Sequence, residues 1–198
     1  MIDLGFRGLT INTQESEPAQ IYAENDAAIY QAILGDGDLL LNYGNNFSID
    51  IASYNTIKVN SGLLAVQGHI GIIEVNDVQT LTLENGTSGV TRNDLIVAEF
   101  TTTGNHGIDT FGLKVLKGSS DGSLPAVTAE DLNNGGKTRQ FAIAKVTMTG
   151  LSVTSAEVIQ TPATCMKDLL RALNERISCG TAAPSGGKDG DIYIQYEA

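Results

Sequence analysis

The chain of 198 residues contains no tryptophan, two histidines and two cysteines. Neither His69 nor His106 lies at a helical or hairpin spacing from a cysteine or from the other histidine, so the sequence predicts no zinc site. Cys165 and Cys179 stand at the two ends of a predicted helix, about 21 Å apart at a rise of about 1.5 Å per residue. That separation is too long for a disulfide, and we expect free thiols in a reducing compartment.

Basic residues are scarce as well. The chain has 12 Lys and Arg against 23 Asp and Glu, a net charge of −11, which opposes binding to nucleic acid and to anionic membrane surfaces. No apolar run approaches the length of a membrane span. Residues 1–5 have neither a basic nor an apolar signal region, so we expect no signal peptide and synthesis in the cytoplasm.

Motifs that carry catalytic or cofactor chemistry are missing from the sequence. It has no Walker sequence, no nucleophile elbow and no dinucleotide-binding glycine pattern. Asp36 and Asp38 resemble the start of a calcium loop, but Leu40 stands where a third oxygen ligand would be needed, and Asp189-Gly190-Asp191 is shorter still. Turns are the preferred interpretation of both segments. We expect a protein that is not an enzyme and that holds no metal or cofactor.

Each histidine also has a simple structural interpretation. His69 is predicted on the less buried face of a strand, because a general base would need positioned partners that the sequence does not supply. His106, between Asn105 and Gly107, is predicted at the tip of a loop.

The chain is rich in glycine, with 22 residues, and in short apolar runs. In residues 61–100, four such runs alternate with turns that carry glycine or asparagine, which predicts an antiparallel β-meander. Residues 64–72 alternate as one strand, and Asn85-Gly86 is typical of a tight hairpin turn. Residues 95–98 are apolar on both faces, which predicts a central strand covered on each side.

The other predicted elements are mostly strands. An N-terminal strand at 9–12 and an extended arm at 13–19 precede a helix of about two turns that begins at Asn25 or Asp26 and ends at Gly35. Further strands are predicted at 39–43, 47–51, 56–59 and 111–117, followed by a surface excursion at 118–137 with a helical turn at 129–132, and by a strand pair at 141–146 and 151–158 around Thr149-Gly150. We therefore predict a mainly β fold, an antiparallel β-sandwich or meander-type module, over residues 1–160.

A helix is predicted from Pro162 to about Ile177, within a segment at 161–179. Thr161 can cap it, and proline suits the first helical position. Its apolar residues are three and four positions apart and form one stripe: Met166, Leu169, Leu170, Leu173 and Ile177. The stripe has two interpretations, packing on the chain's own β core or pairing with copies of the chain around a symmetry axis.

Residues 180–198 are predicted as a linker followed by a short strand. The linker contains Pro184-Ser185-Gly186-Gly187, and residues 191–196 alternate as a strand. We interpret this segment as a separate adhesive element, in which Tyr193 and Tyr196 could offer a small stacking surface to a sugar.

Several blocks of turn residues resemble a known family. They are residues 30–47, Gly62 with Gln67-Gly68-His69, and residues 84–87 with residues 92–97. Together they resemble the N-terminal module of tail and baseplate proteins from phages and prophages of Gram-positive bacteria. Gly180-Thr181, residues 184–187 and residues 190–196 are similar to a short segment of phage tail-fibre proteins.

This resemblance implies a non-enzymatic structural component of the virion that attaches to the tail. It implies a homo-oligomer, a trimer, that docks to other tail or baseplate proteins, since a tail matches rings of protein about one axis. The alternative is a carbohydrate-binding adhesin that recognises host surface glycans, although an aromatic fraction of 6% leaves few stacking surfaces. A hydrolase of cell-surface polymers would need paired carboxylates at a recognisable spacing, which the sequence lacks.

Overall fold

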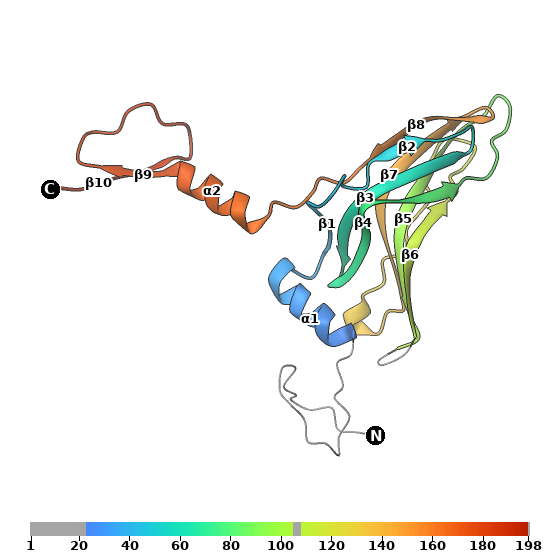
Figure 1. Ribbon diagram of the computed structural model, residues 1–198, viewed down its shortest axis with the longest axis horizontal. Coiled ribbons are helices and arrows are strands. Elements are labelled where there is room, and N and C mark those ends of the chain that lie inside the picture. Colours follow the sequence, from blue (N-terminus) through green and yellow to red (C-terminus); the bar gives the residue numbers. More distant parts are fainter. Residues whose placement is uncertain (1–22, 105–107, 198) are drawn as a thin grey trace, which may run out of the picture. The chain divides into compact units, whose positions relative to one another are not determined.

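The computed structural model describes residues 23–104 and 108–197. The chain divides into two compact units, Met1–Pro162 and Ala163–Ala198 (Figure 1). The described part of the first unit is a mainly β structure of two antiparallel sheets, which confirms the predicted fold class. The predictions for residues 1–5, 9–12, 13–19 and His106 lie outside the described residues.

The first sheet is built around β3 (Thr56–Val66). On one side, β3 pairs with β1 (Asp38–Leu41) and β2 (Ile49–Ile51) at successive points along its length. On its other side it pairs with β4 (His69–Thr82). All three pairings are antiparallel. Because β4 pairs with β3 alone, it is an edge strand of this sheet.

The second sheet has the order β6-β5-β7-β8. Its strands are β5 (Thr91–Thr102), β6 (Asp109–Leu116), β7 (Thr138–Thr149) and β8 (Ser152–Val158). Residues 95–98 lie in β5 between two neighbouring strands and are all buried, so the predicted central strand is confirmed. The predicted turn between β7 and β8 is also confirmed, with Gly150 at φ +60°.

The core lies between the two sheets, which form a sandwich (Figure 1). It is made of large aliphatic and aromatic side chains from both sheets, among them Ile57, Val59 and Leu64 of β3, Ile96 of β5, and Ile143 and Val146 of β7. Side chains two residues apart on a strand share a face, as Ile57 and Val59 do. A register shift between Asn60 and Gly62 of β3 brings Leu64 to the same inner face, and a second shift, where β7 passes Ile96 and Val97 of β5, does so for Ile143 and Val146.

The predicted meander over residues 61–100 is wrong in its connectivity. β4 and β5 belong to different sheets, so residues 83–90 cross from one sheet to the other. The dipeptide Asn85-Gly86 is therefore no hairpin turn. Glycine is needed here because the backbone at residue 86 passes close to Gly150: a Cβ at Gly86 would lie 2.0 Å from the carbonyl oxygen of Gly150.

Residues 64–72 are likewise two strands and not one. Gln67 and Gly68 have φ values of 42° and 81° and form the two-residue turn between β3 and β4. Val66 pairs with His69, so His69 points to the same side as Val66, toward the core, which corrects its predicted place on the less buried face. Ile72 pairs with Leu63 and is exposed, although the single-strand prediction placed it on the face of Leu64.

One end of the sandwich is held by α1 (Ala23–Leu34) and the 3₁₀ helix η1 (Leu132–Asn134) (Figure 1). Buried Gln67 links them. Its carbonyl oxygen accepts a hydrogen bond from Gln31 Nε2 at 2.7 Å, and its Oε1 accepts from the backbone N–H of Leu132 at 2.8 Å. α1 begins at Ala23 and has 12 residues, so it is longer than predicted, while its end before Gly35 is as expected.

The second unit contains α2 (Met166–Arg176), β9 (Ile177–Gly180) and β10 (Ile192–Gln195). Two predictions are corrected here. The helix begins at Met166 and not at Pro162, because Cys165 before it has an extended backbone, with φ −69° and ψ 157°. Ile177 is also outside the helix: its φ of −112° and ψ of 114° are extended, and it opens β9.

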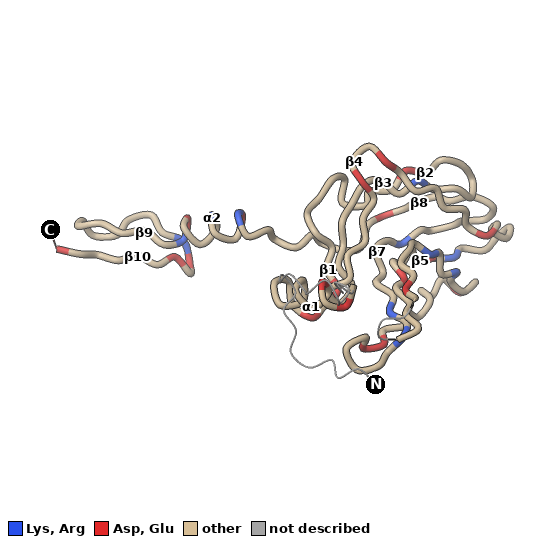
Figure 2. The backbone as a smooth tube through the Cα atoms, turned by 60° about the horizontal axis from the view of Figure 1, so that its bottom comes forward, with Lys and Arg blue, Asp and Glu red and all other residues tan. Residues whose placement is uncertain are grey.

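Basic residues are unevenly distributed over the strands of the first unit (Figure 2). On the described strands, Lys58 is the one basic residue of the first sheet, whereas the second sheet carries Arg92, Lys114, Arg139 and Lys145. Each of these four side chains forms an ion pair with an acidic residue. No helix among the described residues has the length and hydrophobicity of a membrane span.

Candidate functional site

The apolar stripe on α2 is exposed over its whole length. Met166 is 67% exposed, and the other four predicted residues, Leu169, Leu170, Leu173 and Ile177, are each about half exposed. On the polar side of the helix, the guanidinium of Arg171 pairs with Asp168 at 3.1 Å and with Glu175 at 3.9 Å. Large apolar residues of an amphipathic helix normally pack against another element, so this stripe is a candidate contact surface.

The β9–β10 sheet carries a second exposed apolar surface. The two strands run parallel, with Ile192 beside Ile177 and Ile194 beside Cys179. Neighbouring residues of paired strands point to the same face, so these four side chains form one face, which we call the C-terminal apolar face. All four are exposed.

The opposite face of this sheet is held by polar contacts. Tyr193 Oη donates to the carbonyl oxygen of Ala182 at 2.6 Å, and Gln195 Nε2 donates to that of Thr181 at 3.1 Å. Tyr193 lies over Gly180, where a Cβ would be 2.6 Å from the tyrosine hydroxyl. These contacts fold the loop between β9 and β10 back over the sheet.

Tyr193 and Tyr196 do not form one stacking surface. Tyr196 follows Tyr193 by three residues in an extended segment, so their side chains point to opposite faces. The hydroxyl of Tyr193 is engaged with Ala182, whereas Tyr196 is exposed. The two tyrosine rings therefore cannot stack on the same sugar.

None of the described residues of the second unit, 163–197, is buried. A folded segment gains stability chiefly by removing apolar surface from water, and this unit in a single copy removes little. The apolar side chains of α2 and of the β9–β10 sheet therefore stay exposed to water in a single copy.

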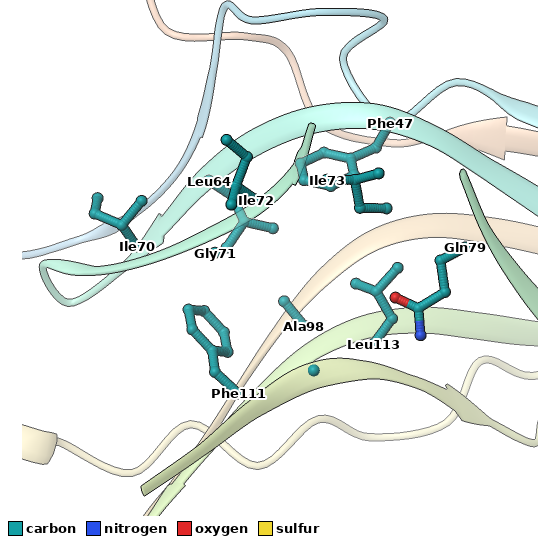
Figure 3. A pocket seen from close by; sticks show the side chains of 11 residues that line it. Phe47, Leu64, Ile70, Gly71, Ile72, Ile73, Gln79, Ala98, Phe111 and Leu113 are labelled. Atoms are coloured by element: carbon teal, nitrogen blue, oxygen red, sulfur yellow. The ribbon is translucent and has the colours of Figure 1, made fainter. Parts of the chain in front are cut away.

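The first unit contains a cavity of about 220 Å³ between β4 and β6, the edge strands that face each other on one side of the sandwich (Figure 3). Its lining side chains are apolar apart from Gln79. Ile73, Phe111 and Leu113 point into this gap. Among the described residues that line it, none carries an acidic, basic or nucleophilic group. We therefore interpret this cavity as a gap in the packing between the two sheets and not as a catalytic site.

A second cavity, of about 240 Å³, lies at the end of the sandwich near α1, and His69 lines it together with Glu24, Asp109 and Lys137. The imidazole stacks on the ring of Phe100, with centroids 3.9 Å apart. Burial lowers the pKa of His69, while the charges of Asp109 and Glu24 act in the opposite direction. Within the described residues, no group of three or more His, Cys, Asp or Glu side chains is placed to hold a metal ion.

Two ion pairs that the sequence did not reveal hold the sandwich together. Asp38 of β1 accepts hydrogen bonds from Arg139 Nε of β7 at 2.8 and 3.0 Å, which joins the two sheets. Arg92 and Asp94 of β5 pair in the interior. The sequence pattern does not reveal either pair. Asp38 and Arg139 are 101 residues apart, and two charged residues at alternate positions of a strand are not by themselves a sign of a buried ion pair.

The sequence blocks from which the phage-tail resemblance was inferred contribute to the fold. Arg92 and Asp94 pair, Gly68 forms the β3–β4 turn, and Gly62 leaves room for the ring of Phe47, which a Cβ would approach to 2.5 Å. A scan against protein-family models finds no match for the chain, and a search among curated proteins finds none. The resemblance therefore rests on these blocks of the sequence.

Proposed function

We propose that this protein is a non-enzymatic structural component of a phage or prophage tail or baseplate, which assembles with copies of itself through α2 and docks to other tail proteins. One observation carries the proposal: the stripe of Met166, Leu169, Leu170 and Leu173 is exposed on a helix of 11 residues. A helix of this length is marginal in water without packing, so it needs a partner.

Copies of the same helix are the partner that fits the stripe best. The apolar residues are three and four positions apart, the spacing with which parallel helices pack around an axis. The ion pairs of Arg171 with Asp168 and Glu175 lie off the stripe and stay in water in such an arrangement. We propose a closed homo-oligomer, a trimer, as the tail resemblance implies.

The first unit supports a scaffold function. Its buried charged residues, Arg92 and Asp94, are engaged with each other, and Asp38 with Arg139 ties one sheet to the other. In the resembling proteins the corresponding module attaches to the tail, so we assign the docking to other tail proteins to this unit. The virion is then the place where the protein acts, and the genes beside its own should encode tape-measure and tail proteins.

The self-assembly is tested by light scattering on the full-length protein and on the variant Leu169→Gln with Leu173→Gln. We expect an oligomer for the wild type and a lower mass for the variant, because the substitutions remove the centre of the stripe. The matched control, Lys167→Gln with Arg171→Gln, has the same spacing on the polar side and should keep the wild-type mass.

Two results would contradict the proposal. A monomeric wild-type protein at micromolar concentration would refute self-assembly, and a fully oligomeric Leu169→Gln, Leu173→Gln variant would remove α2 from the interface. The carbohydrate-binding alternative is separated by glycan titration of the isolated protein, since saturable binding to a host wall glycan that Tyr196→Ala abolishes would favour the adhesin.

A further inference from the structure

The C-terminal apolar face is an uncovered face of a sheet that is too small to stand alone. Two strands of four residues each form it, and an isolated pair of strands is at best marginally stable in water. Parallel pairs are somewhat less stable than antiparallel ones, and parallel sheets are normally covered on both faces. One face is covered by Tyr193 and the loop that it holds, while Ile177, Cys179, Ile192 and Ile194 are left exposed.

The α2 stripe runs directly into this face through Ile177. Ile177 follows Leu173 by four positions, as the stripe requires, and its backbone N–H donates to the carbonyl oxygen of Leu173. It is also the first residue of β9 and the neighbour of Ile192 in β10. The two exposed surfaces of the second unit are therefore continuous along the chain.

The composition of the face suits contact with an identical face. Its four residues are three isoleucines and one cysteine, with no charge to leave unpaired when the face packs on itself. With the α2 stripe and Tyr196, the second unit exposes eight large apolar side chains. Contiguous exposed apolar surface of several hundred Å² marks an interaction site.

We propose that the C-terminal apolar face is closed by the same face of neighbouring copies of this chain, so that the interface begun by α2 continues through β9 and β10. This inference rests on the proposed self-assembly, since cyclic symmetry that brings the α2 helices together side by side also brings the sheets that follow them to the same axis. The second unit is then a folding unit whose core forms between copies.

Cys179 reports directly on this contact because it belongs to the face and is exposed in a single copy. In the variant Cys165→Ser it is the one remaining thiol of the chain. We expect its reaction with a bulky disulfide reagent to be slow in the oligomer, by at least about tenfold against the unfolded chain, because thiol reactivity follows access. The proposal assigns that protection to another copy of the chain.

The proposed contact is broken by adding Ile192→Glu and Ile194→Glu to the Cys165→Ser variant. We expect Cys179 to become as reactive as an exposed thiol, while the circular dichroism of the β-sandwich stays unchanged. The control adds Ser178→Glu, on the opposite face of the sheet, and Ser185→Glu, in the exposed loop between β9 and β10. These substitutions add the same charge outside the C-terminal apolar face and should keep Cys179 protected.

The outcomes separate this inference from the proposed function. Protection of Cys179 that is present in the oligomer and lost in the Ile192→Glu, Ile194→Glu variant supports the continued interface. An oligomer in which Cys179 reacts as fast as in that variant overturns the inference and leaves assembly through α2 intact. A monomeric protein overturns both.

Discussion

Arg92 and Asp94 form a buried ion pair on β5, with Arg92 Nε 2.8 Å from Asp94 Oδ1 and the two side chains 8% and 1% exposed. The carboxylate also accepts from the backbone N–H of Gly118 at 2.8 Å. The guanidinium donates from Nη2 to the carbonyl oxygen of Glu84 at 2.7 Å. The pair thus joins β5 to the segment that crosses between the sheets and to the start of the surface loop after β6.

We expect Arg92→Ala to lower the free energy of unfolding by about 3–5 kcal/mol, because it leaves the carboxylate of Asp94 buried and uncompensated. Urea denaturation measures the change. Lys117→Ala is the control, since the ion pair of Lys117 with Glu84 is exposed to water and should contribute much less to stability. If both variants lose the same free energy of unfolding, the contacts of Arg92 with Asp94 and Glu84 do not stabilise the segment that crosses between the sheets.

Gly68→Ala should destabilise the β3–β4 turn more than Gly89→Ala destabilises its own turn. Both glycines have positive φ, +81° and +75°. A Cβ at Gly68 would also lie 2.1 Å from the carbonyl oxygen of Ala27, whereas one at Gly89 meets nothing within 4 Å. We expect at least about 1 kcal/mol of additional loss for Gly68→Ala, from overpacking against α1. Equal melting temperatures of the two variants would show that α1 moves to make room for the added methyl group without a loss of stability.

Ile96→Asp should prevent soluble folding. Ile96 is fully buried in the central strand β5, and an unpaired carboxylate there costs several kcal/mol, comparable with the stability of a domain. Ile108→Asp is the matched control, because Ile108 is 77% exposed. A soluble Ile96→Asp protein with the wild-type melting temperature would refute the central position of this strand.

A chain that ends at Pro162 should keep the fold of the first unit. The cut falls at the boundary between the two compact units, and the core residues all lie before it. Circular dichroism and thermal melting of the shortened chain decide this, with light scattering as a second measurement, since we expect a monomer. Loss of the cooperative melting transition would mean that the first unit needs the second to fold.

The free energy of unfolding should fall as the pH drops below about 6.5. Burial lowers the pKa of His69 from its usual 6.5, so the unfolded chain takes up this proton at a higher pH than the folded one. Glu130 acts at lower pH, because the backbone N–H groups of Lys137 and Thr138 lower its pKa from 4.5. Chemical denaturation from about pH 7 to 5 should show the loss in the wild type, and a smaller one in His69→Gln. If the free energy of unfolding changes with pH in the same way in both proteins, His69 is not the source of the loss.

Elements with a strong local pattern were predictable. The apolar run at residues 95–98 indicated a central strand, Thr149-Gly150 indicated a turn, and the spacing of Leu169, Leu170 and Leu173 indicated a helix with an apolar stripe; all three elements are found. Each depends on side-chain period or on the φ that a single residue tolerates, and both are properties of a few consecutive residues.

Partners distant in the sequence were not predictable in the same way. The alternation over residues 64–72 continues through the Gln67-Gly68 turn, so the pattern alone did not show that Ile72 faces away from the core. The pairing of Ile177 with Ile192 and of Asp38 with Arg139 joins segments that no local period connects.

The sequence by itself determined the β class, most of the strands and the apolar stripe of the C-terminal helix, because these follow from the order of apolar and polar residues along a short segment. Only the tertiary structure decided which sheet each strand joins, which way His69 points, and that Ile177, Cys179, Ile192 and Ile194 form one exposed face. Those outcomes depend on which distant segments pair and in which register, and a shift of one residue in register would move every side chain of a strand to the other face.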